Sequence, residues 1–209
     1  PLSPNHRLIR DAKSMGIELS EGAAARLQQL LDELERWNRT YNLTAIRDRE
    51  EMVTHHLLDS LAIHAELHGV AIADVGTGAG FPGLPLAVLN PERRFTLIDS
   101  AGKKIRFVNH AAYALGLTNV TGVQARVETL RPEQPFDTVV TRAFAPIPDM
   151  LEKVSSLCGP QTRVLAMKGK WPETELADIP QGWRVERSRD LSVPGLKESR
   201  CVIVLTRQS

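Results

Sequence analysis

From residue 70 onward, short β-branched runs alternate with stretches of helical periodicity. Five runs are separated by enough residues for helices, which predicts βαβ units and a parallel sheet. Two later runs leave no room for a helix and are joined by the turn-forming Val193-Pro194-Gly195, which predicts an antiparallel addition. We therefore expect an α/β fold: an open, doubly wound, mostly parallel seven-stranded sheet with one antiparallel strand and helices on both faces. The runs are 70–75, 94–99, 119–124, 136–142, 163–168, 183–191 and 199–207.

The first 68 residues have a different pattern, which is typical of helices. Ser20 is a suitable helix cap and precedes apolar residues that recur at helical spacing as far as Tyr41. Asp48 is a suitable cap for a second helix, with one side running from Met52 to His64. Because 209 residues are few for two full domains, we expect a helical extension over residues 1–68 and one sheet domain over residues 69–209.

A glycine-rich loop follows the first predicted strand, in the segment Asp74-Val75-Gly76-Thr77-Gly78-Ala79-Gly80-Phe81-Pro82-Gly83. Ligands of open α/β sheets bind beyond the carboxyl ends of the strands, where this loop would lie. Alternating glycines allow positive φ angles and a close approach of the backbone to a ligand. A tight turn without a ligand is the simpler alternative, but four glycines within eight residues favour a nucleotide-binding loop.

Spacing alone allows NAD as the ligand, because Gly78 to Gly83 fits G-x-G-x-x-G and Asp99 stands about 20 residues further on. Two residues disfavour a pyrophosphate: Asp74 is a nearby negative charge, and Pro82 removes an N–H donor where the next helix begins. S-adenosylmethionine has no phosphate and carries two cationic groups, which Asp74 would attract directly or through water. Asp99 suits the ribose hydroxyls of either ligand, so the balance favours S-adenosylmethionine.

Two charged residues follow later strands at the same expected edge of the sheet. Glu128 comes after the third strand, where the adenine end of a ligand would lie, and Arg142 ends the fourth strand. The plain alternative for Glu128 is a carboxylate at a helix start, and for Arg142 it is a surface salt bridge. The residues alone leave these alternatives open.

Both parts of the chain carry longer motifs. These are Trp37-Asn38-x-x-Tyr41-Asn42-Leu43-Thr44, His56-Leu57-Leu58-Asp59-Ser60, DVGTGAGFPGLPLA (74–87), LIDSAGKKIRFV (97–108), RVE (126–128), RAFA (142–145) and MKG (167–169). Over nearly its whole length the chain thereby resembles the RsmG (GidB) family, bacterial methyltransferases that modify N7 of a guanine in 16S ribosomal RNA. The resemblance implies a Rossmann-like class I methyltransferase domain that uses S-adenosylmethionine.

The resemblance also implies, by position, which residues bind the cofactor. Gly76, Gly78 and Phe81 would contact the methionine and nucleoside portions, and Asp99 would bind the ribose hydroxyls. Val127 and Glu128 would flank the adenine. Asp74 and Arg142 are the remaining expected cofactor-binding residues. Phe81 and Val127 have a plain alternative as core residues.

Guanine N7 is a ring nitrogen that has a lone pair and no proton, so its methylation needs neither a protein nucleophile nor a general base. The task is to hold N7 in line with the S–CH3 bond, about 3 Å away. We therefore expect positioning by Arg142 and Lys168 and no certain catalytic residue. Residues 100–209 carry 16 basic and 11 acidic side chains, and several basic residues follow predicted strand ends. The expected RNA contacts are Lys103, Lys104, Arg106, Lys168 and Lys170.

The remaining expectations come from absences in the sequence. No apolar run approaches the roughly 20 residues that span a bilayer, and PLSPNHRLIR lacks a secretion pattern, so we expect a cytoplasmic protein. Cys158 and Cys201 lie in separate apolar segments and predict buried free thiols. His64 and His68 lack a third ligand, so we expect no metal site. The expected partner is small-subunit ribosomal RNA, with or without ribosomal proteins, bound by a monomer.

Three rival functions stay open. An NAD-dependent oxidoreductase would need a proton-transfer pair such as Tyr-x-x-x-Lys, which the sequence does not offer. A non-catalytic RNA-binding module is disfavoured by the intact glycine-rich loop and Glu128. Methylation of a small molecule or a protein is disfavoured by the basic residues at the strand ends.

Overall fold

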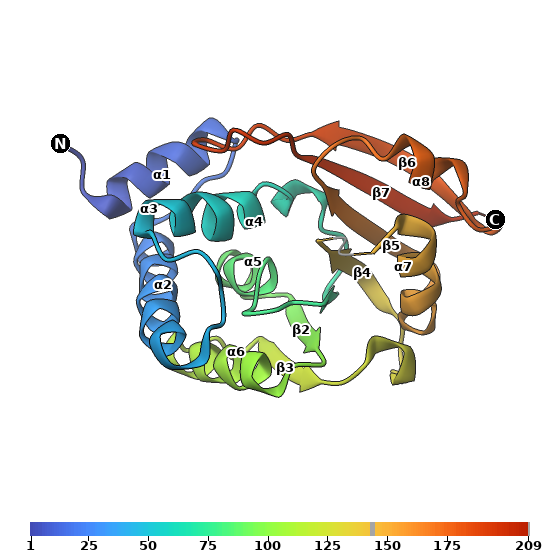
Figure 1. Ribbon diagram of the computed structural model, residues 1–209, viewed down its shortest axis with the longest axis horizontal. Coiled ribbons are helices and arrows are strands. Elements are labelled where there is room, and N and C mark those ends of the chain that lie inside the picture. The colour runs from blue at the N-terminus through green and yellow to red at the C-terminus, as the bar shows by residue number, and fades with distance from the viewer. Residues whose placement is uncertain (143–144, 209) are drawn as a thin grey trace.

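The computed structural model of the protein describes residues 1–142 and 145–208, and one seven-stranded sheet forms its centre (Figure 1). The strand order is β3-β2-β1-β4-β5-β7-β6. β1 to β5 are mutually parallel, whereas β7 is antiparallel to both β5 and β6. The predicted sheet and its antiparallel strand are therefore confirmed. The strands are β1 (Ala71–Val75), β2 (Arg94–Asp99), β3 (Val120–Gln124), β4 (Phe136–Thr141), β5 (Cys158–Lys168), β6 (Trp183–Asp190) and β7 (Cys201–Arg207).

Helices precede the sheet and connect its strands. They are α1 (Pro4–Ser14), α2 (Glu21–Tyr41), α3 (Arg49–Met52), α4 (Asp59–Leu61), α5 (Gly83–Leu89), α6 (Gly102–Ala114), α7 (Ile147–Val154) and α8 (Glu173–Ala177). The π-helical turn Val53–Leu58 joins α3 to α4, and a 3-10 turn, His64–Glu66, follows. No helix within the described ranges combines the length and apolarity needed to cross a membrane.

The two predicted N-terminal helix caps are confirmed. The Ser20 hydroxyl accepts a hydrogen bond from the backbone N–H of Ala23 at 3.0 Å, at the start of α2. The Asp48 carboxylate accepts one from the N–H of Glu51, also at 3.0 Å, at the start of α3. Each cap satisfies a donor that the first turn of a helix leaves without a partner.

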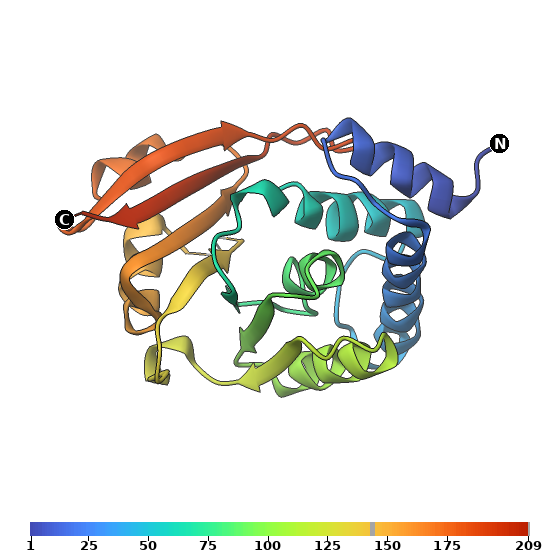
Figure 2. The same cartoon turned by 180° about the vertical axis from the view of Figure 1, so that it is seen from behind.

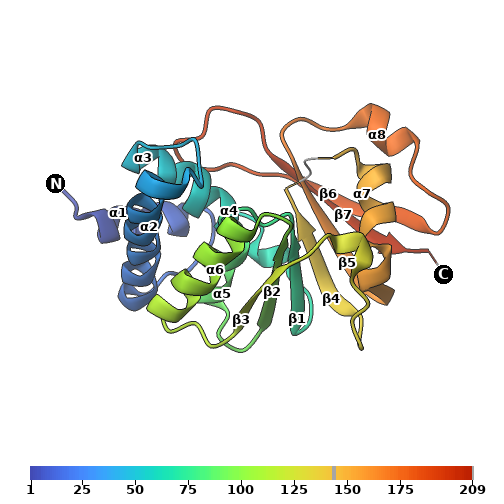
Figure 3. The same cartoon turned by 60° about the horizontal axis from the view of Figure 1, so that its bottom comes forward.

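The sheet is covered on both faces, with α2, α5 and α6 on one side and α7 on the other (Figure 3). Successive residues of one strand divide between the two cores: Ile72 packs with the N-terminal helices, whereas Ala73 packs with α7. Burial on both faces explains why the predicted strands are nearly continuous apolar runs.

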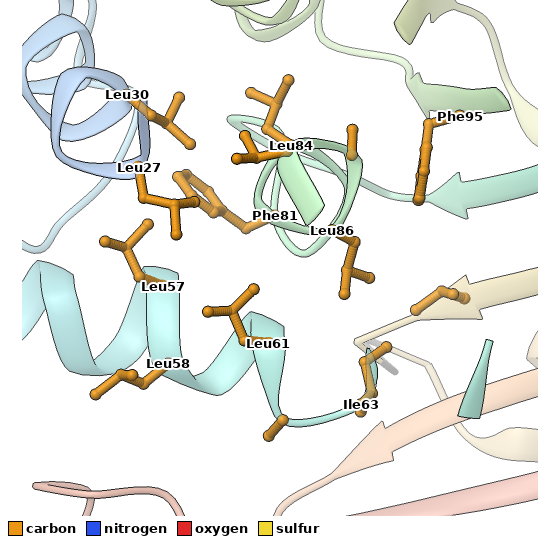
Figure 4. Close-up of a cluster of buried hydrophobic side chains, with 14 of the residues drawn as sticks. Leu27, Leu30, Leu57, Leu58, Leu61, Ile63, Phe81, Leu84, Leu86 and Phe95 are labelled. Atoms are coloured by element: carbon orange, nitrogen blue, oxygen red, sulfur yellow. The ribbon is translucent and has the colours of Figure 1, made fainter. Parts of the chain in front are cut away.

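The helical extension over residues 1–68 shares a core with the sheet. Figure 4 shows leucines of α2 and of the segment 57–61 facing Phe81 and Leu84, beyond the glycine-rich loop. α1 lies beside the loop between β6 and β7 when seen from either side (Figure 2). The extension therefore forms part of the layer that covers one sheet face.

A buried carboxylate joins the extension to the edge strand. Glu66, which is 4% exposed, accepts hydrogen bonds from Arg187 and Arg189 on β6, the latter at 2.9 Å. Its backbone carbonyl accepts another from Arg163 on β5, at 3.0 Å. These contacts link the end of the extension to the antiparallel part of the sheet.

Candidate functional site

A cleft of about 460 Å³ opens at the carboxyl ends of the first three strands. Its walls come from the ends of β1 and β2, the first turn of α6, the segment after β3, and α7. The residues that line it are Val75, Gly76, Gly78, Ile98, Asp99, Ser100, Lys104, Ala125, Arg126, Val127, Glu128 and Lys153. The sequence predicted this edge, and the structure brings five of the predicted cofactor residues together there: Gly76, Gly78, Asp99, Val127 and Glu128.

The glycine-rich loop has the backbone conformation that its sequence predicted. Gly76, Gly78 and Gly80 have φ angles of 69°, 58° and 102°. A Cβ atom on Gly78 would find no heavy atom within 4 Å, so open space faces this residue in the cleft wall. A Cβ on Gly83 would instead stand 2.7 Å from Leu97 and 2.8 Å from Asp74. The lack of a side chain at Gly78 therefore leaves space in the cleft, and at Gly83 it allows α5 to pack closely on β2.

Asp99 ends β2 and forms the floor between the loop and α6. Its carboxylate accepts hydrogen bonds from the N–H groups of Gly78 at 2.8 Å and Ala101 at 2.9 Å. The side chain is half-buried and lines the cleft. Because each carboxylate oxygen can accept two bonds, Asp99 retains capacity for a hydroxyl ligand.

Asp74 lies behind the loop and does not line the cleft. It is 1% exposed, and its Oδ2 accepts hydrogen bonds from the Thr77 hydroxyl at 2.6 Å and the Gly83 N–H at 2.8 Å. Burial raises the pKa of Asp74 to about 6. Its Oδ1 has no hydrogen-bond partner among the described residues. Asp74 therefore contacts the loop and the start of α5 from behind, and its predicted attraction of a cationic ligand, directly or through water, stays a prediction.

The start of α5 offers a pyrophosphate no free donor among its first residues. The N–H of Gly83 is taken by Asp74, and the N–H of Leu84 donates to the Gly80 carbonyl at 2.7 Å. Pro82 and Pro85 have no N–H. Since dinucleotide folds bind the pyrophosphate at this helix start, the geometry disfavours NAD.

Phe81 points into the core and not into the cleft. It is 3% exposed and lies among buried leucines (Figure 4), and its ring stacks on that of His56, with 4.6 Å between the ring centroids. The Phe81 side chain therefore does not line the cleft, and the predicted contact between Phe81 and the cofactor stays a prediction. Nε2 of His56 pairs with the Thr44 hydroxyl at 2.9 Å, and burial, with Arg142 nearby, lowers the pKa of His56 to about 4.

Arg142 lies in a cluster with Asp59 and Arg200, which we call the Asp59 cluster. Nη2 of Arg142 donates to the Asp59 carboxylate at 3.0 Å and to the His55 carbonyl at 3.1 Å. Nε of Arg200 donates to the same carboxylate at 3.3 Å. Asp59 is 1% exposed, so this carboxylate orients two guanidinium groups from different strand ends. Arg142 does not line the cleft, and Ala143 and Phe144 of the RAFA motif lie outside the described residues.

The predicted RNA-binding lysines and arginine differ in exposure. Lys103, Arg106 and Lys170 are exposed, and Lys104 lines the cleft. Nζ of Lys168 donates to Glu175 at 2.6 Å and to the Ala145 carbonyl at 3.2 Å, so this side chain bridges two segments, and its predicted RNA contact stays a prediction. Lys153 in the cleft wall was not predicted, because only tertiary packing brings α7 to this edge.

The remaining predictions for the described part of the chain concern metal ligands and cysteines. No three histidine, cysteine or acidic residues there are grouped as metal ligands, and His64 and His68 gain no third partner. Both cysteines are free.

Comparisons with known proteins agree with these observations. Residues 23–204 match the GidB family model, described as rRNA small subunit methyltransferase G. Proteins named Ribosomal RNA small subunit methyltransferase G are similar to this chain in Pseudomonas paraeruginosa (48% identical, covering 96% of this chain and 94% of that protein) and Idiomarina loihiensis (44% identical, covering 92% and 94%).

Solved structures share the fold at low sequence identity. A SAM dependent methyltransferase from Aquifex aeolicus has a TM-score of 0.57 and 21% identity, covering 76% of this chain and 94% of its own. A SAM-dependent methyltransferase from Thiobacillus denitrificans in complex with S-adenosyl-L-homocysteine has a TM-score of 0.51 and 12% identity, covering 77% and 99%. These similarities confirm the predicted Rossmann-like methyltransferase architecture.

Proposed function

Because the chain belongs to the GidB family, rRNA small subunit methyltransferase G, we propose that it transfers a methyl group from S-adenosylmethionine to N7 of a guanine in 16S ribosomal RNA. The cleft between the glycine-rich loop and Asp99 carries this proposal. We further propose that the chain acts as a cytoplasmic monomer on the small-subunit RNA, with or without ribosomal proteins.

The residues of the cleft fit S-adenosylmethionine. The open space at Gly78 admits a ligand against the backbone, and Asp99 offers acceptor capacity for ribose hydroxyls beside it. Val127 and Glu128, at the other end of the cleft, provide an apolar and a polar contact for adenine. The closed start of α5 suits a ligand without phosphates. When bound, S-adenosylmethionine supplies a methyl group on a cationic sulfur.

The residues around the cleft suit positioning more than proton transfer. Guanine N7 has no proton to lose, and His56 and Asp74 are buried away from the cleft. The Asp59 cluster fixes the guanidinium of Arg142, whose donors match the O6 acceptor of guanine or a phosphate. Exposed Lys103, Arg106 and Lys170 would neutralise phosphates, which predicts salt-dependent RNA binding. An in-line transfer without a general base follows.

Radiolabelled methyl transfer tests the proposal directly. The protein is incubated with methyl-labelled S-adenosylmethionine and either 16S RNA or small subunits from cells that lack this protein, and the labelled base is mapped. Label on one guanine at N7 is the expected result. Label on another base, or tight NAD binding without affinity for S-adenosylhomocysteine in equilibrium dialysis, contradicts it.

Two variants separate the roles within the site. Arg142→Ala is expected to lower methyl transfer by about tenfold or more while S-adenosylhomocysteine affinity stays unchanged, since Arg142 lies outside the cleft. Glu128→Ala is expected to weaken S-adenosylhomocysteine by about tenfold, through loss of a charged hydrogen-bond partner. Calorimetry measures the S-adenosylhomocysteine affinity of both variants. Lost affinity in Arg142→Ala with unchanged affinity in Glu128→Ala would place Arg142, and not Glu128, in the cofactor site.

A further inference from the structure

Trp171 is an exposed aromatic residue at the end of the sheet that carries the cleft. It follows β5 by three residues, and the residue is 46% exposed. Because β1, β4 and β5 are parallel neighbours, the end of β5 lies about 10 Å along the sheet edge from β1. The Trp171 segment and the loop that carries α8 lie beyond this edge in Figure 3.

The indole of Trp171 has no specific interaction partner within the described residues. It makes no hydrogen bond, ring contact or cation contact there, in contrast to Trp37, which stacks on His110, and Trp183, which lies under Arg207. The part of a large apolar side chain that stays in water forgoes the stabilisation that burial provides. An exposed tryptophan beside a site is therefore a candidate for ligand contact.

The backbone around Trp171 is held on both sides. Before it, Lys168 donates to Glu175 and to the Ala145 carbonyl. After it, the N–H of Glu173 donates to the Trp171 carbonyl at 3.1 Å, and Glu175 also accepts from the Ile147 N–H at 2.8 Å. These contacts fix the segment against the chain that follows β4, so little order has to be gained when a ligand binds the indole.

We propose that Trp171 is a stacking platform for a base of the RNA next to the methylated nucleotide, with Lys170 on an adjoining phosphate. Base–aromatic stacking beside a basic side chain is a general mode of single-stranded nucleic-acid recognition. The exposed Lys170 favours RNA over an apolar protein surface as the occupant. The inference rests on the proposed function, because it takes the rRNA substrate from there.

The test compares Trp171→Ala, Trp171→Phe and a control, Tyr113→Ala, in the full chain. Tyr113 is 88% exposed on α6, at the end of that helix remote from the cleft. With protein-free 16S RNA lacking the modification, Trp171→Ala is expected to raise the KM for RNA about tenfold, and Trp171→Phe to stay within about threefold of the wild type. S-adenosylhomocysteine affinity should be unchanged in all three, and the KM should be unchanged in Tyr113→Ala.

Tryptophan fluorescence adds a measurement that depends on contact between the Trp171 indole and RNA, and not on a structural role of the residue. RNA binding should quench tryptophan emission in the wild type, and the quenching should be lost in Trp171→Phe while filter retention still detects the complex. An unchanged KM in Trp171→Ala, an equal defect in Trp171→Phe, or a defect seen only with assembled subunits overturns the stacking proposal. RNA binding with quenching but without methyl transfer would support stacking and refute the proposed function.

Discussion

Gly78 and Gly83 belong to one loop, but an alanine should mainly reduce ligand affinity at Gly78 and mainly reduce stability at Gly83. Gly78 has open space at its Cβ position and a φ of 58°, so Gly78→Ala should cost only about 1 kcal/mol of stability while its methyl group enters the cleft. Gly83→Ala places a methyl against Leu97 and Asp74 and should cost about 1–3 kcal/mol.

Urea unfolding and calorimetry with S-adenosylhomocysteine distinguish the two glycines. Gly78→Ala is expected to lose about tenfold or more in ligand affinity with a nearly normal unfolding midpoint. The division would be refuted if Gly78→Ala bound ligand normally, or if Gly83→Ala were as stable as the wild type.

Asp74 makes the stability of the protein depend on pH in a definite direction. Burial raises the pKa of Asp74 from 3.8 to about 6, so the folded state binds this proton more tightly than the unfolded state does. The resulting stabilisation is present below pH 3.8 and is lost as the pH rises through 6. Asp74→Asn stays neutral and can still accept from Thr77 and Gly83.

Unfolding of the wild type and Asp74→Asn at pH 4 and pH 7 measures this effect. Between these values the free energy of unfolding of the variant should rise by about 2 kcal/mol relative to that of the wild type. All other titrating groups are shared, so the difference isolates Asp74. A gap that does not change with pH would mean that Asp74 stays charged in the folded protein.

At the residue scale, the sequence predicted best where a side chain immediately follows a strand. Asp99 and Glu128 could be placed in the cleft because parallel strands bring their carboxyl ends to one edge. The sequence did not predict the internal contacts of Asp74, Phe81 and Lys168, because only the folded chain brings their partners Gly83, His56 and Glu175 to them.

At the scale of elements, the strands and helix caps were predictable, whereas irregular backbone was not. β-branched runs identify strands buried on both faces, and Ser20 and Asp48 identify helix starts. The π-helical turn Val53–Leu58 adds a residue to a helix whose apolar pattern remains helical, so periodicity does not reveal it. The early start of β5 at Cys158 depends on pairing with Phe136, which is a tertiary contact.

The link between the helical extension and β6 depends on Glu66. Glu66→Ala should lower stability by about 1–3 kcal/mol, because Arg187 and Arg189 lose the buried carboxylate they share. The cost should not be larger, since both arginines are about half exposed and can be hydrated. Urea unfolding measures it, and Glu186→Ala, whose ion pairs are 3.9 Å long, is the control with an expected cost below about 0.5 kcal/mol. Equal costs would show that Glu66 does not anchor the extension.

At the scale of the whole molecule, the extension and the sheet share one apolar core. A single apolar core runs from Leu8 in α1 to Val204 in β7, and it contains the leucines of α2 that face the glycine-rich loop. The loop that forms the cleft wall is therefore supported from behind by residues 1–68, through the stacking of Phe81 on His56. We propose that residues 1–68 and 69–209 differ in sequence pattern but fold together as one unit.

Truncation tests that proposal. Residues 69–209 alone should not unfold cooperatively, because removing α2 and the segment through α4 uncovers a sheet face that includes Leu84 and Phe81. Each fully buried leucine contributes about 1.5–3 kcal/mol, so losing several exceeds the typical 5–15 kcal/mol stability of a domain. A chain that lacks only residues 1–18 loses the smaller contribution of α1, which buries Leu8 and Ala12, and should still unfold in one transition at a lower midpoint. Circular dichroism during heating separates these outcomes, and a sharp transition in 69–209 near that of the full chain would show that the sheet domain folds independently.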